Sequence, residues 1–129
     1  MYSHVMLGVN DMDASRKFYD ALFAVLGVKP GVMDPKGRCF YMGNDGIFIL
    51  SNPINGESAC NGNGSTIGFA VDGPAQGDAW HAAGVANGGV SIEDAPGIRQ
   101  GGSTGELYLA YLKDPAGNKI CAMYRVPSE

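Results

Sequence analysis

Residues 4–11, His4-Val5-Met6-Leu7-Gly8-Val9-Asn10-Asp11, decide the fold of this chain, because a similar stretch begins again at Thr66. The second stretch reads Thr66-Ile67-Gly68-Phe69-Ala70-Val71-Asp72. In both, large apolar residues occupy alternate positions, which predicts a β-strand. At the same offset Trp80 corresponds to Phe18, and Gly89 corresponds to Gly27. Agreement over a strand, a helix and a helix end indicates an internal duplication.

The residues after the first stretch predict a helix and three strands. Between residues 12 and 26 apolar side chains recur every three or four positions, and Gly27 follows where a helix would end. Short apolar runs separated by turn residues then occupy positions 28–33, 38–42 and 47–50. The first half is therefore predicted as βαβββ.

The second half repeats this order after a segment rich in Asn, Gly, Ser and Pro, residues 52–64, which has the composition of an exposed linker. A strand is expected at 66–72, and a helix at 74–87, although Gly77 and Gly84 weaken a helix. Further strands are expected near residues 90–92, 107–112 and 119–125, with 97–105 as a loop. The turn Asp114-Pro115-Ala116-Gly117-Asn118 joins the last two.

The chain length bounds the architecture. A chain of 129 residues suits one domain, and each half is too small to bury its own sheet. We expect a single α+β domain spanning residues 1–129, with module 1 at about 1–52, a linker at about 53–64 and module 2 at about 65–129. Helices would cover one face of each sheet, and the other faces would curve around a shared cavity.

Composition and charge exclude several classes of protein. The formal net charge is −4 and the nine Lys and Arg residues are scattered, which argues against a nucleic-acid partner. The chain begins without a leader pattern and lacks a run of about 18 apolar residues, so we expect no membrane partner. Three widely spaced cysteines indicate reduced thiols rather than a disulfide framework, which favours the cytoplasm.

Strand alternation also predicts which residues face the cavity. Val5 and Leu7 would pack under the helices, which leaves the intervening residues on the other face. The cavity is then expected to be lined by His4, Met6, Thr66, Cys121 and Met123. Gly8 and Gly68 lie on the same side, where a missing side chain would leave space for a ligand.

These features resemble the vicinal oxygen chelate superfamily, which includes glyoxalase I, bleomycin-resistance proteins and extradiol dioxygenases. The resemblance is carried by residues 4–11, by Ser15-Arg16-Lys17-Phe18-Tyr19, and by residues 113–120, Lys113-Asp114-Pro115-Ala116-Gly117-Asn118-Lys119-Ile120. It implies paired βαβββ modules, a homodimer, and a small-molecule ligand bound where modules meet.

The resemblance also implies positions for a divalent metal. Catalytic members use up to four side chains, and the matching positions here are His4, Ile49, Thr66 and Cys121, where glyoxalase I would have His, Glu, His and Glu. Only His4 agrees, and Ile49 has no ligating atom. Cys121 would supply a soft thiolate where hard oxygen ligands are expected. We therefore expect no metal cofactor, and a divalent metal is disfavoured.

Several side chains are candidates for chemistry. His4 has three interpretations: a metal ligand, a polar or acid–base group in the cavity, or a strand histidine satisfied by a neighbour. Glu106 is a candidate base near the cavity mouth, although acids at strand ends are usually solvated. Arg38 and Arg99 can bind an anionic substrate or lie exposed. Tyr108 is expected among the substrate-binding residues.

Three functions follow from these observations. The first is binding of a small molecule in the cavity, with or without catalysis and without the usual metal. The second is a metal-dependent lyase or isomerase of the lactoylglutathione-lyase type with an altered ligand set drawn from His4, Glu106 and Cys121. The third is a non-enzymatic dimeric accessory protein whose cavity is filled by side chains.

Overall fold

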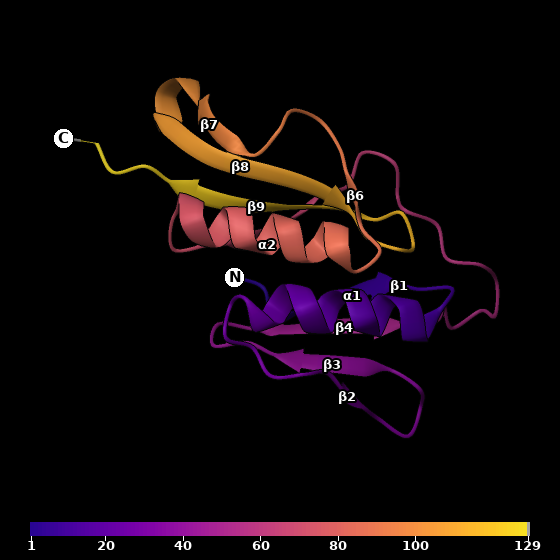
Figure 1. Ribbon diagram of the computed structural model, residues 1–129. Helices are drawn as coiled ribbons and strands as arrows, with labels where there is room; N and C mark the ends of the chain where they lie inside the picture. Colours follow the sequence, from indigo (N-terminus) through magenta and orange to yellow (C-terminus); the bar gives the residue numbers. More distant parts are fainter. Residues whose placement is uncertain (129) are drawn as a thin grey trace.

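The computed structural model describes residues 1–128 and contains two modules joined by a linker (Figure 1). The first module consists of β1 (His4–Gly8), α1 (Met12–Ala24), β2 (Val32–Met33), β3 (Cys39–Met42) and β4 (Ile47–Ser51). The second consists of β5 (Ile67–Ala70), α2 (Pro74–Ala86), β6 (Val90–Ser91), β7 (Gly97–Gln100), β8 (Glu106–Lys113) and β9 (Lys119–Arg125), with a short 3₁₀ helix at Gly102–Thr104.

Each module forms its own sheet. The strand order is β1-β4-β3-β2 in the first sheet and β5-β9-β8-β6 in the second, with β7 also paired to β8. In both sheets the strand before the helix runs parallel to the last strand of the module, and the remaining pairs are antiparallel. The predicted duplication of a βαβββ unit within an α+β fold is confirmed.

Two strands differ from the sequence-based expectation. β7 lies inside the segment predicted as a loop, because its single large apolar residue, Ile98, gives no alternating pattern. The strand forms because the long β8 offers backbone partners to residues 97–100. β2 is shorter than predicted, because Val28 donates its N–H to the carbonyl of Phe23 and so belongs to the helix end.

The glycines that weaken the prediction of α2 explain how this helix packs. Gly77 and Gly84 are buried, and a Cβ at either position would collide with the ring of Tyr108 or with Leu112 on β8. Their small size lets the helix backbone approach the sheet closely, and this packing offsets their poor helix propensity.

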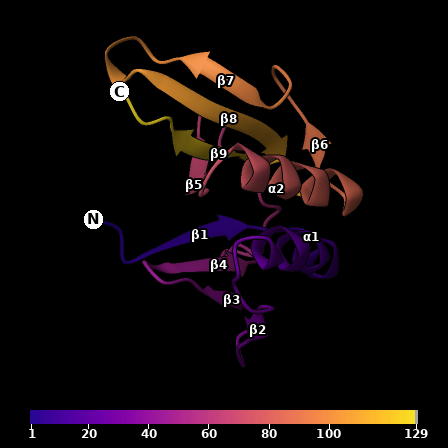
Figure 2. The ribbon, with the colours of Figure 1, turned by 60° about the vertical axis from the view of Figure 1, so that its left-hand side comes forward.

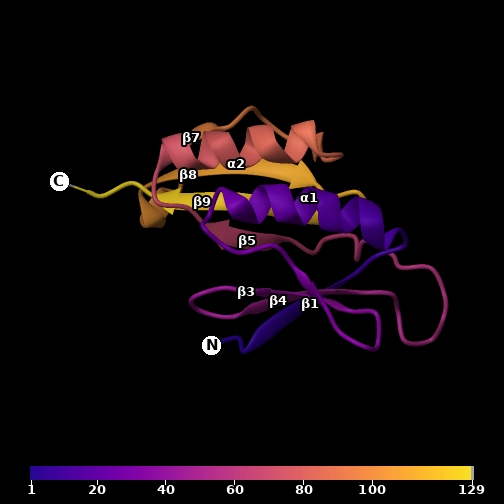
Figure 3. The same ribbon diagram turned by 60° about the horizontal axis from the view of Figure 1, so that its bottom comes forward.

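The two modules share one hydrophobic core. Its fully buried members come from both halves and include Phe18 and Leu22 of α1, Trp80 of α2, and Leu112 and Ile120 of the second sheet. The helices α1 and α2 run beside each other (Figure 3). Figure 2 shows α1 and α2 in the middle of the molecule, with β7, β8 and β9 above them and β3 and β2 below. One face of each sheet is therefore turned away from the helices.

Over residues 1–128, the structure has no helix long and apolar enough to cross a membrane.

Candidate functional site

The sheet faces opposite the helices present two sets of side chains, which we call the first and second open faces. Strand register defines them, because paired residues share a face. The first open face contains His4, Met6, Phe40, Met42, Ile47 and Ile49. The second open face contains Gly68, Ala70, Gly97, Arg99, Leu107, Leu109, Tyr111, Cys121, Met123 and Arg125.

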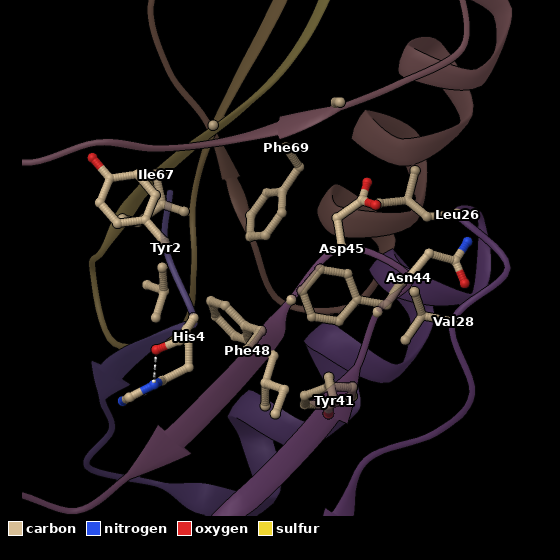
Figure 4. A pocket seen from close by; sticks show the side chains of 18 of the residues that line it. Tyr2, His4, Leu26, Val28, Tyr41, Asn44, Asp45, Phe48, Ile67 and Phe69 are labelled. Carbon is tan, nitrogen blue, oxygen red and sulfur yellow. Dashed lines mark hydrogen bonds between the residues drawn. The ribbon is translucent and has the colours of Figure 1, made fainter.

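A cleft of about 630 Å³ lies between the modules (Figure 4). It is bounded by residues 1–5, by the turn at 43–46 and by β5. Phe23, Phe48 and Phe69 form an aromatic floor, with ring centroids 5.2–5.6 Å apart. Asp45 and Asp72 lie among the polar residues of the lining. Its volume lies within the usual range of small-molecule sites.

His4 stands at the edge of this cleft. Its Nδ1 lies 2.8 Å from the hydroxyl oxygen of Ser3. Figure 4 shows the imidazole turned away from Phe48, as expected for a residue on the first open face. The backbone of His4 thus lines the cleft, while the ring points to where the cleft meets that open face.

The other residues expected in the cavity lie beside the cleft rather than in it. Met6 is 45% exposed on the first open face. Cys121 and Met123 lie on β9, next to Gly68 and Ala70 of β5, which do line the cleft. Thr66 lies just before β5 and outside the lining. Along β5, the lining of the cleft is therefore directly adjacent to Cys121 and Met123.

The thiol of Cys121 is buried, and burial raises its pKa, so that it stays protonated near neutral pH. A protonated, buried thiol behaves as a small apolar group. A ligand that lies over Gly68 and Ala70 would contact it.

Tyr108, Glu106 and Arg38 are placed apart from the cleft. Tyr108 is 1% exposed on the helix-covered face of the second sheet, and its hydroxyl donates to Oδ1 of Asp78 over 2.7 Å. Glu106 shares that face by strand alternation and accepts a hydrogen bond from Gln100. Helix α2 covers this face, so neither side chain reaches a ligand on the open side.

Arg38 is held by two interactions of its own. Its Nε donates to Oδ2 of Asp34 over 2.8 Å, and the two residues form an ion pair. The guanidinium carbon also lies 5.4 Å from the ring centroid of Phe40. Its charge is therefore already neutralised by Asp34.

Gly8 does not leave an empty space. A Cβ at this position would lie 2.8 Å from the Cβ of Ala59, because the linker crosses the end of β1 there. Asn10 holds the linker in place, since its side chain accepts from the N–H of Ala59 and donates to the carbonyl of the same residue. The expectation that Gly8 leaves space for a ligand was therefore wrong.

The aromatic floor was missed from the sequence. Phe48 and Phe69 occupy core-facing positions of their strands, and alternation assigns such positions to packing under the helices. Phe69 lies on the edge strand β5, and Phe48 lies on β4 beside the edge strand β1, so both side chains border the space between the two sheets. Periodicity contains no signal for a gap between two sheets.

Residues 2–122 match the model of the Glyoxalase/Bleomycin resistance protein/Dioxygenase superfamily. The chain belongs to this superfamily. No functionally curated protein was found to match it.

Solved structures agree with this superfamily assignment. A glyoxalase/bleomycin resistance protein from Albidiferax ferrireducens T118 shares 57% identity with a TM-score of 0.92, covering 96% of this chain and 98% of the other. A family enzyme from Burkholderia phytofirmans PsJN, at 19% identity and a TM-score of 0.74 over 96% and 98% of the two chains, shows the same fold. So does a glyoxalase-related enzyme from Fulvimarina pelagi, at 20% identity and 0.71 over 95% and 86%.

The superfamily's catalytic members imply a divalent metal, and the residues of this chain do not fit one. Ile49 is 5% exposed and has no donor atom, and the Cys121 thiol stays protonated. Among the described residues, no three His, Cys, Asp or Glu side chains are grouped so that they could hold a metal ion. The donor set of a glyoxalase-type centre is therefore not assembled within this chain.

Proposed function

We propose that this superfamily member binds a small, largely apolar molecule in the cleft between its two modules, without a glyoxalase-type metal centre. The observation that carries this proposal is the cleft itself, with its volume of about 630 Å³ and its floor of Phe23, Phe48 and Phe69. Aromatic side chains offer a large apolar surface of low conformational entropy, which suits an apolar ligand.

Polar groups at the edge of the cleft would orient such a ligand. His4 and Ser3 form a hydrogen-bonded pair where the cleft meets the first open face. An imidazole there can donate a hydrogen bond to the ligand or accept one from it.

A second copy of the chain is part of this proposal. On the first open face Met6 and Met42 are 45% and 62% exposed, and the neighbouring Val32 of β2 is 66% exposed. Apolar side chains grouped in this way are usually covered by a partner. A homodimer that covers the first open face would also enclose the cleft near His4. We also propose a cytoplasmic location, which the three free cysteines of the described residues support.

The test uses a fluorescent neutral probe, the methyl ester of dansylaminoundecanoic acid, titrated into the protein. Ala70→Phe places a ring at the mouth of the cleft from an exposed strand position, so it should abolish the fluorescence enhancement while the protein remains folded. Ala82→Phe on the exposed side of α2 is the matched control and should bind as the wild type does. Equal binding by both variants, or no binding by the wild type, would contradict the proposed function.

A further inference from the structure

Arg99 lies on the second open face, opposite Leu107 of β8 in the β7–β8 pairing. Its guanidinium turns back along the chain and donates hydrogen bonds to three backbone carbonyls. These belong to Gly97 at 3.0 Å, Ala95 at 2.9 Å and Asp94 at 3.2 Å. Backbone carbonyls hold the side chain in one place without neutralising its charge.

Among the other cations near the open faces, Arg125 of β9 lies across Leu107 from Arg99 and adds to the positive charge there, whereas two are neutralised. Arg38 forms its ion pair with Asp34, and Lys119 forms one with Glu93. Within residues 1–128, no such ion pair is found for Arg99. A guanidinium has five N–H donors, so three carbonyl contacts leave two for another acceptor. Arg99 is therefore a positioned cation with spare donors.

The groups around Arg99 do not cancel its charge. Burial raises the pKa of Tyr111 and of Cys121, so both side chains are neutral near pH 7. The strand pairing also places a row of apolar and small residues between Arg99 and the cleft. From β7 to β5 this row is Gly97, Leu109, Met123 and Ala70.

The cleft and Arg99 differ in charge. Asp45 and Asp72 are acidic groups in the cleft lining, which contains neither Lys nor Arg, so an oxyanion is disfavoured there. Arg99 lies three strand spacings from β5, a distance of about 14 Å. One extended ligand can therefore place its apolar part in the cleft and its anionic group at Arg99.

We propose that Arg99 binds the oxyanion of an amphipathic ligand whose apolar body lies over Leu109 and Met123 and enters the cleft beside Ala70. This role rests on the proposed function, because the same ligand occupies the cleft. The ligand class is an elongated apolar molecule with one carboxylate, sulfonate or phosphate at its end. Charge-assisted hydrogen bonds from a positioned guanidinium suit each of these groups.

The experiment compares dansylaminoundecanoic acid with its methyl ester, which differs only in lacking the negative charge. Both are titrated by fluorescence into the full chain at low and moderate salt. The wild type should bind the acid about tenfold more tightly than the ester. Arg99→Gln should remove that difference by weakening only the acid, and added salt should weaken only the acid. Lys17→Gln changes the net charge equally from an exposed position on α1 and should leave the difference intact.

The outcomes separate this inference from the proposed function. If the ester binds but the acid gains nothing over it, or if Arg99→Gln and Lys17→Gln act alike, the role of Arg99 is overturned and the cleft remains a ligand site. If the ester does not bind at all, both fail. Should Arg99→Gln prove unfolded, Arg99→Lys keeps the charge while losing the carbonyl contacts. It should retain most of the salt-sensitive preference for the acid, and its failure to do so would overturn the inference.

Discussion

Tyr19 of α1 donates its hydroxyl hydrogen to Oδ2 of Asp114 over 2.7 Å, and this buried bond joins the first module to the β8–β9 turn of the second. Asp114 is 3% exposed and also accepts from the backbone N–H groups of Ala116 and Asn118. Asn118 in turn donates to the carbonyl of Gly8 at the end of β1. The turn that carries the family resemblance therefore also holds the two modules together.

Tyr19→Phe should lower the free energy of unfolding by about 1–3 kcal/mol, because it leaves a buried carboxylate without one of its donors. Urea denaturation followed by circular dichroism measures the change. Tyr2→Phe, at an exposed tyrosine, is the control and should have no effect. If the two variants were equally stable, the Tyr19–Asp114 bond would not hold the modules together.

Gly84→Ala should destabilise the protein by about 1–3 kcal/mol, although alanine favours helices. The added Cβ would collide with Leu112 and press on Leu22 and Phe18. Thermal or urea unfolding tests this, with Ala82→Gly as the reverse change on the exposed side of the same helix. That control should cost about 1 kcal/mol through helix propensity alone. A more stable Gly84→Ala protein would show that α2 does not need its close approach to β8.

The ion pair of Asp34 with Arg38 should make the stability of the folded protein depend on pH in the acidic range. The hydrogen bond from Arg38 lowers the pKa of Asp34, so the stabilisation is fully present above the ordinary aspartate value of about 3.9. It is lost as pH falls through the lowered folded-state pKa. Melting temperatures between about pH 6 and pH 2 should fall less steeply in Asp34→Asn than in the wild type. Parallel curves would contradict this assignment.

Met42→Lys should convert the proposed homodimer to a monomer, because it places a charge in the apolar part of the first open face. Light scattering coupled to size-exclusion chromatography measures the molar mass. Val85→Lys, at a 47% exposed position on α2, introduces the same charge on the opposite side and should leave the dimer intact. A wild-type chain that is monomeric at every concentration tested would remove the dimer from the proposed function.

Much of the fold was predictable from the residues because the relevant physics is local. Alternation in residues 4–8 and 67–70 predicts strands, the spacing of Phe18 and Leu22 predicts a helix, and the repeat predicts two like modules. β7 was not predictable in this way, since it depends on the partner that β8 provides rather than on its own pattern.

The candidate site was predictable only in part. Alternation correctly assigned His4 to the open side of its sheet, but it could not show that Phe48 and Phe69 are partly uncovered between the modules. Nor could it show which arginine keeps a free charge, since Arg38 and Arg99 look equivalent until Asp34 and the 94–97 backbone are placed around them. The sequence by itself determined the duplicated βαβββ fold and its superfamily, because strand and helix periodicity act over a few residues. Only the tertiary structure decided where the cleft opens and which arginine keeps an unneutralised charge on the second open face, because both depend on how separate segments of the chain lie against one another.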